Sequence, residues 1–220
     1  MTVNQTLTAT LANAVKESAN RIPAEVREVM LNANDEIIKT GIEGTALKAG
    51  DTAPDFTVTN HKGEAVTLSE RLKDGPVVVI FYRGGWCPYC NMELYAYEQE
   101  LETLKGLGAN LIAITPETPD NSLTTIEKNG LSYDVLSDSD FIASDAFGLT
   151  FTFPEALIKV YSGFGLNVPD TNGDTEWRLP IPAAYVIDQT GKIILHHVDV
   201  DYTKRLDPVD VVAALKANAG

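Results

Sequence analysis

The chain has 220 residues, of which 44% are hydrophobic and 22% are charged. This composition is typical of a soluble globular protein and excludes a disordered or fibrous chain. The formal net charge of −14 repels phosphate backbones and anionic lipid headgroups, so neither nucleic acid nor a membrane surface is expected as a partner.

The beginning of the chain carries no targeting pattern. Residues 1–7 contain no basic segment followed by an apolar core, so no secretory signal is expected. The longest apolar run, at residues 76–82, is too short to cross a bilayer. We therefore expect a cytoplasmic protein.

Two amphipathic helices are predicted first. Apolar residues recur at helical spacing in residues 7–20, and Pro23 starts a second helix at the position that proline favours. This second helix is expected to end at Gly41 or Gly44. Residues 1–47 are thus predicted to form a helical extension. It could cover either the domain that follows or a second subunit, so a homodimer remains open.

From residue 48 to residue 220 strands alternate with helices, which predicts one α/β domain with a central mixed sheet flanked by helices. Residues 56–59 and 65–68 are predicted to form a hairpin. Residues 77–82 are apolar throughout, as in a strand buried on both faces, and a long helix is expected over residues 88–107.

The remaining predicted elements are a buried strand at 110–115, a helix at 120–129, a hairpin of 183–187 with 192–197, and a helix at 207–218. Pro208 stands at the start of the last helix. Residues 141–182 are rich in Phe, Gly and Pro, and we assign no element to them. Asp138 and Asp140 are predicted to cap a helix that starts near Phe141.

The strongest functional signal is the run Phe81-Tyr82-Arg83-Gly84-Gly85-Trp86-Cys87-Pro88-Tyr89-Cys90 between the buried strand and the long helix. It places Cys87 at a helix N-terminus, where backbone N–H groups and the helix dipole stabilise a thiolate. Cys87 is therefore the predicted nucleophile. Cys90 lies one helical turn later and is predicted to attack the bond that Cys87 forms with substrate, which leaves an internal disulfide.

Four neighbours of the cysteines are predicted to shape the pocket. Pro88 has no N–H to lose and suits the first helical turn. Arg83 adds positive charge beside the thiolate, with a solvated loop arginine as the alternative. Trp86 is interpreted as a packing lid, and Tyr89 either shapes the pocket or packs as an ordinary core aromatic.

With these motifs the chain resembles the thioredoxin superfamily, and within it the peroxiredoxin-like alkyl hydroperoxide reductase/thiol-specific antioxidant family. Gly50-Asp51-Thr52-Ala53-Pro54-Asp55-Phe56, Leu136-Ser137-Asp138 and Ala184-Tyr185-Val186-Ile187-Asp188 are similar to strands of that family. The resemblance covers residues 48–215. It implies a thioredoxin-like fold, a hydroperoxide substrate, and thioredoxin or a glutaredoxin/glutathione system as the reductant. It implies no metal, flavin or nucleotide cofactor.

The site departs from the family pattern. Peroxiredoxins carry Pro-x-x-x-Thr-x-x-Cys, whereas this chain has Ile80 and Gly84 at the Pro and Thr positions. Their later arginine aligns with Pro182, which is instead similar to the thioredoxin cis-proline that packs against the disulfide. Arg178 is a candidate replacement for the missing arginine.

Two functions remain open from the sequence. One is a thiol peroxidase, in which Cys87 becomes a sulfenic acid and Cys90 condenses with it. The other is a thiol–disulfide oxidoreductase acting on protein or small-molecule disulfides. The family resemblance favours the peroxidase, and the Cys-x-x-Cys spacing with Pro182 favours disulfide exchange.

Zinc binding and a non-enzymatic interaction module are weaker alternatives. Zinc needs four ligands, and the histidines of the chain are His61, His196 and His197. The adjacent pair is predicted on a strand, so its side chains point to opposite faces and cannot both bind one ion.

Overall fold

The computed structural model describes residues 6–218. Residues 1–5 lie outside the described residues. The prediction that residues 1–7 carry no secretory signal therefore falls mostly outside the described part of the chain. The predicted N-terminal helices are confirmed as α1 (Leu7–Arg21) and α2 (Ala24–Lys39). Pro23 is the N-cap residue of α2, one position before the first turn in which it is predicted. The short helix α3 (Ile42–Thr45) follows. Within residues 6–218 no helix has the length and apolar character needed to cross a membrane.

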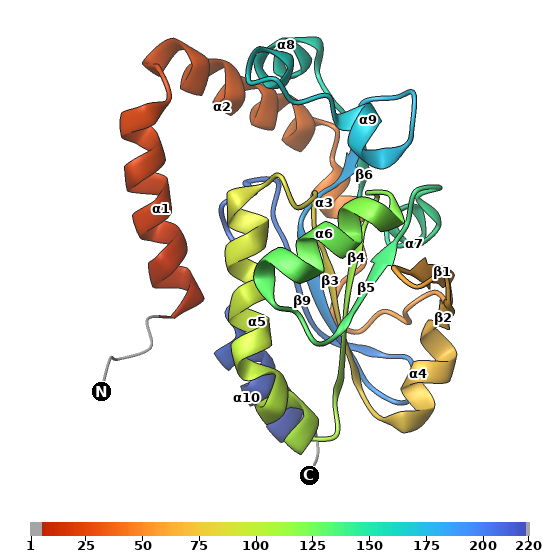
Figure 1. The fold of residues 1–220 in the computed structure, drawn as a ribbon. Coiled ribbons are helices and arrows are strands. Elements are labelled where there is room, and N and C mark those ends of the chain that lie inside the picture. Colours follow the sequence, from red (N-terminus) through yellow and green to blue (C-terminus); the bar gives the residue numbers. More distant parts are fainter. Residues whose placement is uncertain (1–5, 219–220) are drawn as a thin grey trace.

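The two N-terminal helices form an arm along one side and the top of the sheet domain (Figure 1). Leu7 and Leu11 of α1 are buried in the same hydrophobic cluster as Cys87 and Cys90. On α2, Met30 and the neighbouring apolar residues pack against the segment that contains α8 (Glu155–Gly163). Within the described chain the arm therefore packs on the sheet domain that follows it.

A seven-stranded mixed sheet forms the centre, with strand order β2-β1-β5-β4-β3-β8-β9. Its strands are β1 (Thr57–Asn60), β2 (Ala65–Thr67), β3 (Val77–Phe81), β4 (Asn110–Thr115), β5 (Asp134–Ser137), β8 (Ala183–Ile187) and β9 (Ile193–Val198). β3 pairs in parallel with β4 and antiparallel with β8. The predicted α/β class with a central mixed sheet is confirmed.

Both faces of β3 are covered, which explains why its sequence is apolar throughout. Val78 and Ile80 point into the cluster formed with α5 (Pro88–Gly106) and α10 (Pro208–Asn218), which lie side by side in Figure 1. Val77 and Phe81 point into the opposite cluster, which includes Phe147. The end of β3 is thereby held rigidly where the cysteine motif begins.

Two further helices contact the sheet. The predicted helix after β4 is confirmed as α6 (Pro119–Asn129). The helix α4 (Leu68–Asp74) was not predicted, because Leu68 continues the apolar alternation of the hairpin. Its first turn is fixed by Asp55, whose carboxylate accepts hydrogen bonds from the backbone N–H of Ser69 at 2.9 Å and from its hydroxyl at 2.7 Å. Because these hydrogen bonds to Asp55 start the helix at Leu68, β2 ends at Thr67, one residue before the predicted end of the strand.

Residues 141–182, in which the sequence pattern predicts no element, contain five short elements: α7 (Ile142–Ala146), β6 (Thr150–Thr152), α8 (Glu155–Gly163), α9 (Val168–Asn172) and β7 (Arg178–Pro180). β6 and β7 form a separate antiparallel pair. The first element is capped as predicted by Asp138, whose carboxylate accepts from the backbone N–H of Ser144 at 2.8 Å. Asp140 makes no such bond within the described chain, and its predicted capping role is wrong.

Candidate active site

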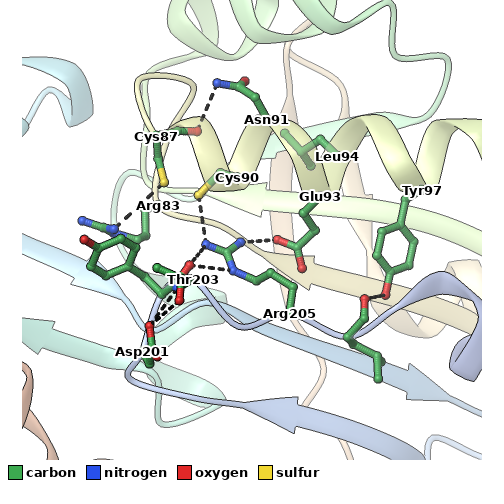
Figure 2. A network of polar contacts seen from close by, with 12 residues as sticks. Arg83, Cys87, Cys90, Asn91, Glu93, Leu94, Tyr97, Asp201, Thr203 and Arg205 are labelled. Carbon is green, nitrogen blue, oxygen red and sulfur yellow. Dashed lines mark hydrogen bonds and ion pairs between the residues drawn. The ribbon is translucent and has the colours of Figure 1, made fainter. Parts of the chain in front are cut away.

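The cysteine motif joins the end of β3 to the start of α5, as the sequence predicts. Cys87 is the N-cap residue of α5 and Pro88 occupies its first turn. Both cysteines are free thiols, and they are 1% and 0% exposed, respectively. Figure 2 shows the two sulfur atoms on the same side of the helix, each facing an arginine side chain.

The turn before Cys87 depends on glycine. Gly84 has a φ of +152°, and a Cβ at this residue would lie 2.3 Å from Nε1 of Trp86 and 2.9 Å from Oε1 of Glu117. The backbone N–H of Gly85 donates to the Glu117 carboxylate at 2.8 Å. This close approach of backbone and side chains sets the direction in which the chain enters α5.

Arg83 is buried beside Cys87 and is not a solvated loop residue. It is 3% exposed, and its Nη1 lies 4.0 Å from the Cys87 sulfur. Its Nη2 donates to the hydroxyl of Tyr161, a residue of α8. The guanidinium also lies against the aromatic rings of Trp86 and Tyr202, at 4.9 Å and 4.2 Å from their centroids. Arg83 is thus held in one position next to the sulfur.

A second arginine faces Cys90, and sequence reasoning missed it. Nη2 of Arg205 lies 3.5 Å from the Cys90 sulfur, and its Nη1 pairs with the carboxylate of Glu93. Arg205 comes from the segment between β9 and α10, far from the cysteines in sequence, so no local pattern links them. Glu93 offers the one available signal, because it lies among the core-facing positions of α5 and a buried carboxylate needs a partner.

The two thiols differ in acidity. Burial alone would raise the pKa of Cys87, but the hydrogen bond from Cys90 and the charges of Arg83 and Arg205 lower that pKa to about 5. Burial raises the pKa of Cys90 well above its usual value, and the hydrogen bond to Cys87 and the Cys87 charge act in the same direction. At neutral pH the site therefore holds a Cys87 thiolate and a Cys90 thiol.

This difference predicts a pH profile for alkylation of the reduced protein by iodoacetamide. Only the thiolate reacts, so the rate is expected to rise with pH through a midpoint near 5, the pKa of Cys87, and then to stay level across neutral pH. Cys87→Ser is expected to remove this acidic phase. A single midpoint in the alkaline range would contradict the assignment of Cys87 as the stabilised thiolate.

The other predicted pocket residues surround this pair. The ring of Trp86 packs edge-on against Tyr161 at 5.8 Å between centroids. Tyr89 packs against Tyr202 at 5.6 Å, and its hydroxyl donates to Ser18 of α1 at 3.0 Å. The structure therefore brings Arg83, Trp86, Pro88 and Tyr89 together with the cysteines, and it adds the arm to the site.

Pro182 lies near the site, but not as the sequence predicts. It lines a cavity of about 20 Å³ together with Arg83, Tyr161 and Tyr202. No cis peptide bond occurs in the described chain, so the cis-proline prediction is wrong. Ile181 and Pro182 connect β7 to β8, and Ala183 already pairs with Phe81.

Arg178 does not replace the missing family arginine. Its guanidinium pairs with Asp174 at 2.8 Å and Glu176 at 3.3 Å, and it lies over the ring of Phe141 at 4.4 Å. The arginines that reach the thiols are Arg83 and Arg205. Between residues 6 and 218, no three histidine, cysteine or carboxylate side chains are grouped so that they could hold a metal ion.

Comparison with known proteins gives a consistent result. The model of the AhpC/TSA family matches residues 49–196. Peroxiredoxin Bcp of Escherichia coli is 31% identical over 103 residues, which cover 47% of this chain and 65% of that protein. A putative peroxiredoxin of Mycobacterium tuberculosis is 27% identical over 159 residues, covering 72% of this chain and 90% of that protein. The alignment with the Escherichia coli protein thus spans slightly less than two thirds of its length.

Two solved structures show the same fold at low sequence identity. Peroxidoxin BcpB from Mycobacterium tuberculosis matches with a TM-score of 0.61 and 22% identity, over 78% of this chain and 97% of that one. Peroxiredoxin Q of Xanthomonas campestris matches with a TM-score of 0.57 and 17% identity, over 75% and 92%. These matches confirm the predicted thioredoxin-like fold.

Proposed function

Because the chain belongs to the AhpC/TSA family, we propose that it is a thiol peroxidase that reduces hydroperoxides through Cys87 and Cys90. The observation that carries this proposal is the geometry of Cys87, a thiolate at neutral pH with a fixed arginine on one side and a second thiol one helical turn away. The two relatives described above are named a peroxiredoxin and a putative peroxiredoxin, which supports the same reaction class.

In the first step the Cys87 thiolate attacks the O–O bond of a hydroperoxide. An S–O bond forms, the O–O bond breaks, and two electrons pass from sulfur to the peroxide. The departing oxygen takes a proton and leaves as an alcohol or water, and Cys87 becomes a sulfenic acid. The positive charge of Arg83 lies beside this sulfur, where it stabilises the thiolate and the negative charge that develops on the departing oxygen.

Arg83 compensates in this proposal for the two missing family residues. Gly84 has no hydroxyl to orient a peroxide, and Pro182 has no charge. The Tyr161 hydroxyl accepts a hydrogen bond from Arg83. In this proposal the proton of the Tyr161 hydroxyl is donated to a peroxide oxygen bound beside Arg83.

In the second step Cys90 attacks the sulfenic sulfur of Cys87. An S–S bond forms, the S–O bond breaks, and the oxygen leaves as water with the Cys90 proton. A dithiol such as thioredoxin, or a glutaredoxin/glutathione system, then reduces the disulfide. A reducing cytoplasm, the predicted location, would supply such thiols. We further propose that the extension at residues 1–47 covers the redox domain at residues 48–220 and limits access to Cys87.

Stopped-flow fluorescence tests the proposed activity, because Trp86 lies beside the reacting sulfur. Mixing the reduced protein with hydrogen peroxide, or with an alkyl hydroperoxide, is expected to give a second-order fluorescence change much faster than the oxidation of free cysteine at the same pH. Oxidation no faster than that of free cysteine would overturn the peroxidase. Rapid reduction of a disulfide substrate by the same protein would then make disulfide exchange its function.

A further inference from the structure

The ion pair of Arg205 and Glu93 lies directly behind the second thiol (Figure 2), and its arginine contacts the Cys90 sulfur. Both side chains are 1% exposed. Removing two charges from water costs several kcal/mol for each ion, and the attraction between them repays this only with good geometry and further hydrogen bonds. Such a pair beside a reactive sulfur calls for a chemical explanation.

The guanidinium of Arg205 is fixed by more than its carboxylate partner. Its Nε and Nη2 both donate to the carbonyl oxygen of Tyr202, at 3.1 Å and 2.7 Å. Its Nη1 pairs with Glu93, which is held one turn beyond Cys90 on α5. With these contacts made, Nη2 also points at the Cys90 sulfur at 3.5 Å. The positive charge is therefore held at a fixed distance from that sulfur.

We propose that Arg205 is a catalytic residue for the chemistry of Cys90 and that Glu93 is its positioning residue. Arg205 stabilises negative charge on the Cys90 sulfur when the disulfide forms and again when it is reduced. Glu93 orients Arg205 and partly offsets its charge, so that Cys90 stays protonated until Cys87 has reacted. The first of these two steps rests on the proposed peroxidase function, whereas the second requires only the disulfide.

The charge on Cys90 is largest during reduction. A thiolate of an external dithiol attacks the Cys87 sulfur, a mixed disulfide forms, the Cys87–Cys90 bond breaks, and Cys90 leaves as a thiolate. The second thiol of the reductant then attacks the mixed disulfide, which releases Cys87 and leaves the reductant oxidised. A leaving thiol departs faster when its pKa is lower. The charge of Arg205 lowers the pKa of Cys90, against the larger effects of burial and of Cys87.

Other titratable groups face the same cluster from several elements. Tyr82 and Arg83 directly follow β3, Glu117 follows β4, and Tyr161 approaches from α8. Tyr97 of α5 and His197 of β9 lie near Arg205. Burial raises the pKa of Glu93 to about 7, although Arg205 acts to lower it. Two substitutions separate the effect of the ion pair from that of these groups. One removes the positive charge of Arg205 and the other removes the negative charge of Glu93, so their effects on Cys90 are expected to be opposite.

The test measures the rate at which dithiothreitol reduces the Cys87–Cys90 disulfide, formed beforehand with diamide and followed by tryptophan fluorescence. Arg205→Met is expected to slow reduction at neutral pH by about tenfold, the equivalent of raising the leaving-group pKa by about two units at a Brønsted coefficient of about 0.5. Glu93→Gln, which keeps a hydrogen-bonding side chain but removes the opposing charge, is expected to accelerate it. The pH dependence of Cys90 alkylation should shift upward in the first variant and downward in the second.

Two further variants make the outcome decisive. Glu102→Gln removes a carboxylate from an exposed ion pair on the same helix and is expected to leave the rate unchanged. If Arg205→Met does not fold, the double variant Glu93→Gln/Arg205→Met, which leaves no unpaired buried charge, replaces it and is expected to be slow as well. Equal slowing by Glu93→Gln and Arg205→Met, or no change in either, would overturn the proposal.

The design also separates this proposal from the peroxidase. The disulfide is formed with diamide and reduced with dithiothreitol, so no step of the assay involves a hydroperoxide. If the protein does not react with peroxide but the two substitutions have opposite effects, the peroxidase proposal is wrong and the role of Arg205 at Cys90 is supported. If the protein reacts with peroxide but the substitutions have no such effects, only the role of Arg205 is wrong.

Discussion

Replacing Cys87 with serine is expected to abolish peroxide consumption in the presence of a dithiol, while replacing Cys90 with serine stops turnover at a later point. The serine hydroxyl is not ionised at neutral pH and cannot supply the two electrons that reduce the O–O bond. In Cys90→Ser the Cys87 sulfur remains, and Arg83 still lies beside it at 4.0 Å. Each molecule of that variant is expected to consume one molecule of peroxide and to accumulate as a sulfenic acid.

Mass spectrometry of the intact protein distinguishes these products. Oxidised wild-type protein is expected to lose two hydrogen atoms as the disulfide forms, whereas Cys90→Ser gains one oxygen atom and reacts with dimedone. Cys87→Ser should show neither change at the same peroxide concentration. Dimedone labelling of Cys87→Ser, or a sulfenic acid at Cys90 in the wild type, would reverse the assignment of the two cysteines.

The parts of this site that follow from local sequence were predictable. The central strands are identified by apolar runs; the predicted strand at residues 110–115 coincides with β4, for example. The Cys-Pro-Tyr-Cys run between a strand and a helix fixes the place of both cysteines, because the end of β3 and the start of α5 are set by the same residues. Both features depend on interactions between residues that are close in the sequence, and such interactions can be inferred from a single sequence.

The parts that depend on contacts between distant segments were not predictable. Tyr161 reaches Arg83 from α8, in a region broken into short elements by residues such as Pro154 and Gly165. Arg205 contacts Cys90 although the two residues are 115 positions apart in the sequence, and the sequence around Arg205 resembles an exposed loop. The sequence also does not decide whether Arg83 is buried or solvated, because the aromatic rings that surround it come from three separate segments of the chain.

Gly84 belongs to the local cysteine motif, but the reason that a glycine is required there is a contact seen only in the structure. It stands where the family carries threonine, so the substitution looks like a loss of function in the sequence. In the structure its φ of +152° and the lack of a side chain allow Trp86 and Glu117 to close over the turn. The same glycine that removes a hydroxyl from the peroxide site thus permits the packing that buries Arg83 and Cys87.

Gly84→Ala is therefore expected to lower the free energy of unfolding by about 3 kcal/mol, since it combines an unfavourable backbone conformation with overpacking. Its Cβ would lie 2.3 Å from Nε1 of Trp86, a rigid ring that is itself packed against Tyr161. Urea denaturation of the reduced protein measures the change. Displacement of Trp86 should also alter the native fluorescence and expose Cys87 to faster alkylation.

Gly106→Ala is the matched control, because it makes the same chemical change at the end of α5 where a Cβ meets no atom within 4 Å. Alanine in a helix is more stable than glycine by roughly 0.5–1 kcal/mol, so this variant is expected to be slightly more stable than the wild type. The two substitutions should therefore move the urea midpoint in opposite directions. Equal stability of the two variants would show that the turn before Cys87 accepts a side chain. The packing of Trp86 and Glu117 would then not be what holds the cysteine motif in place.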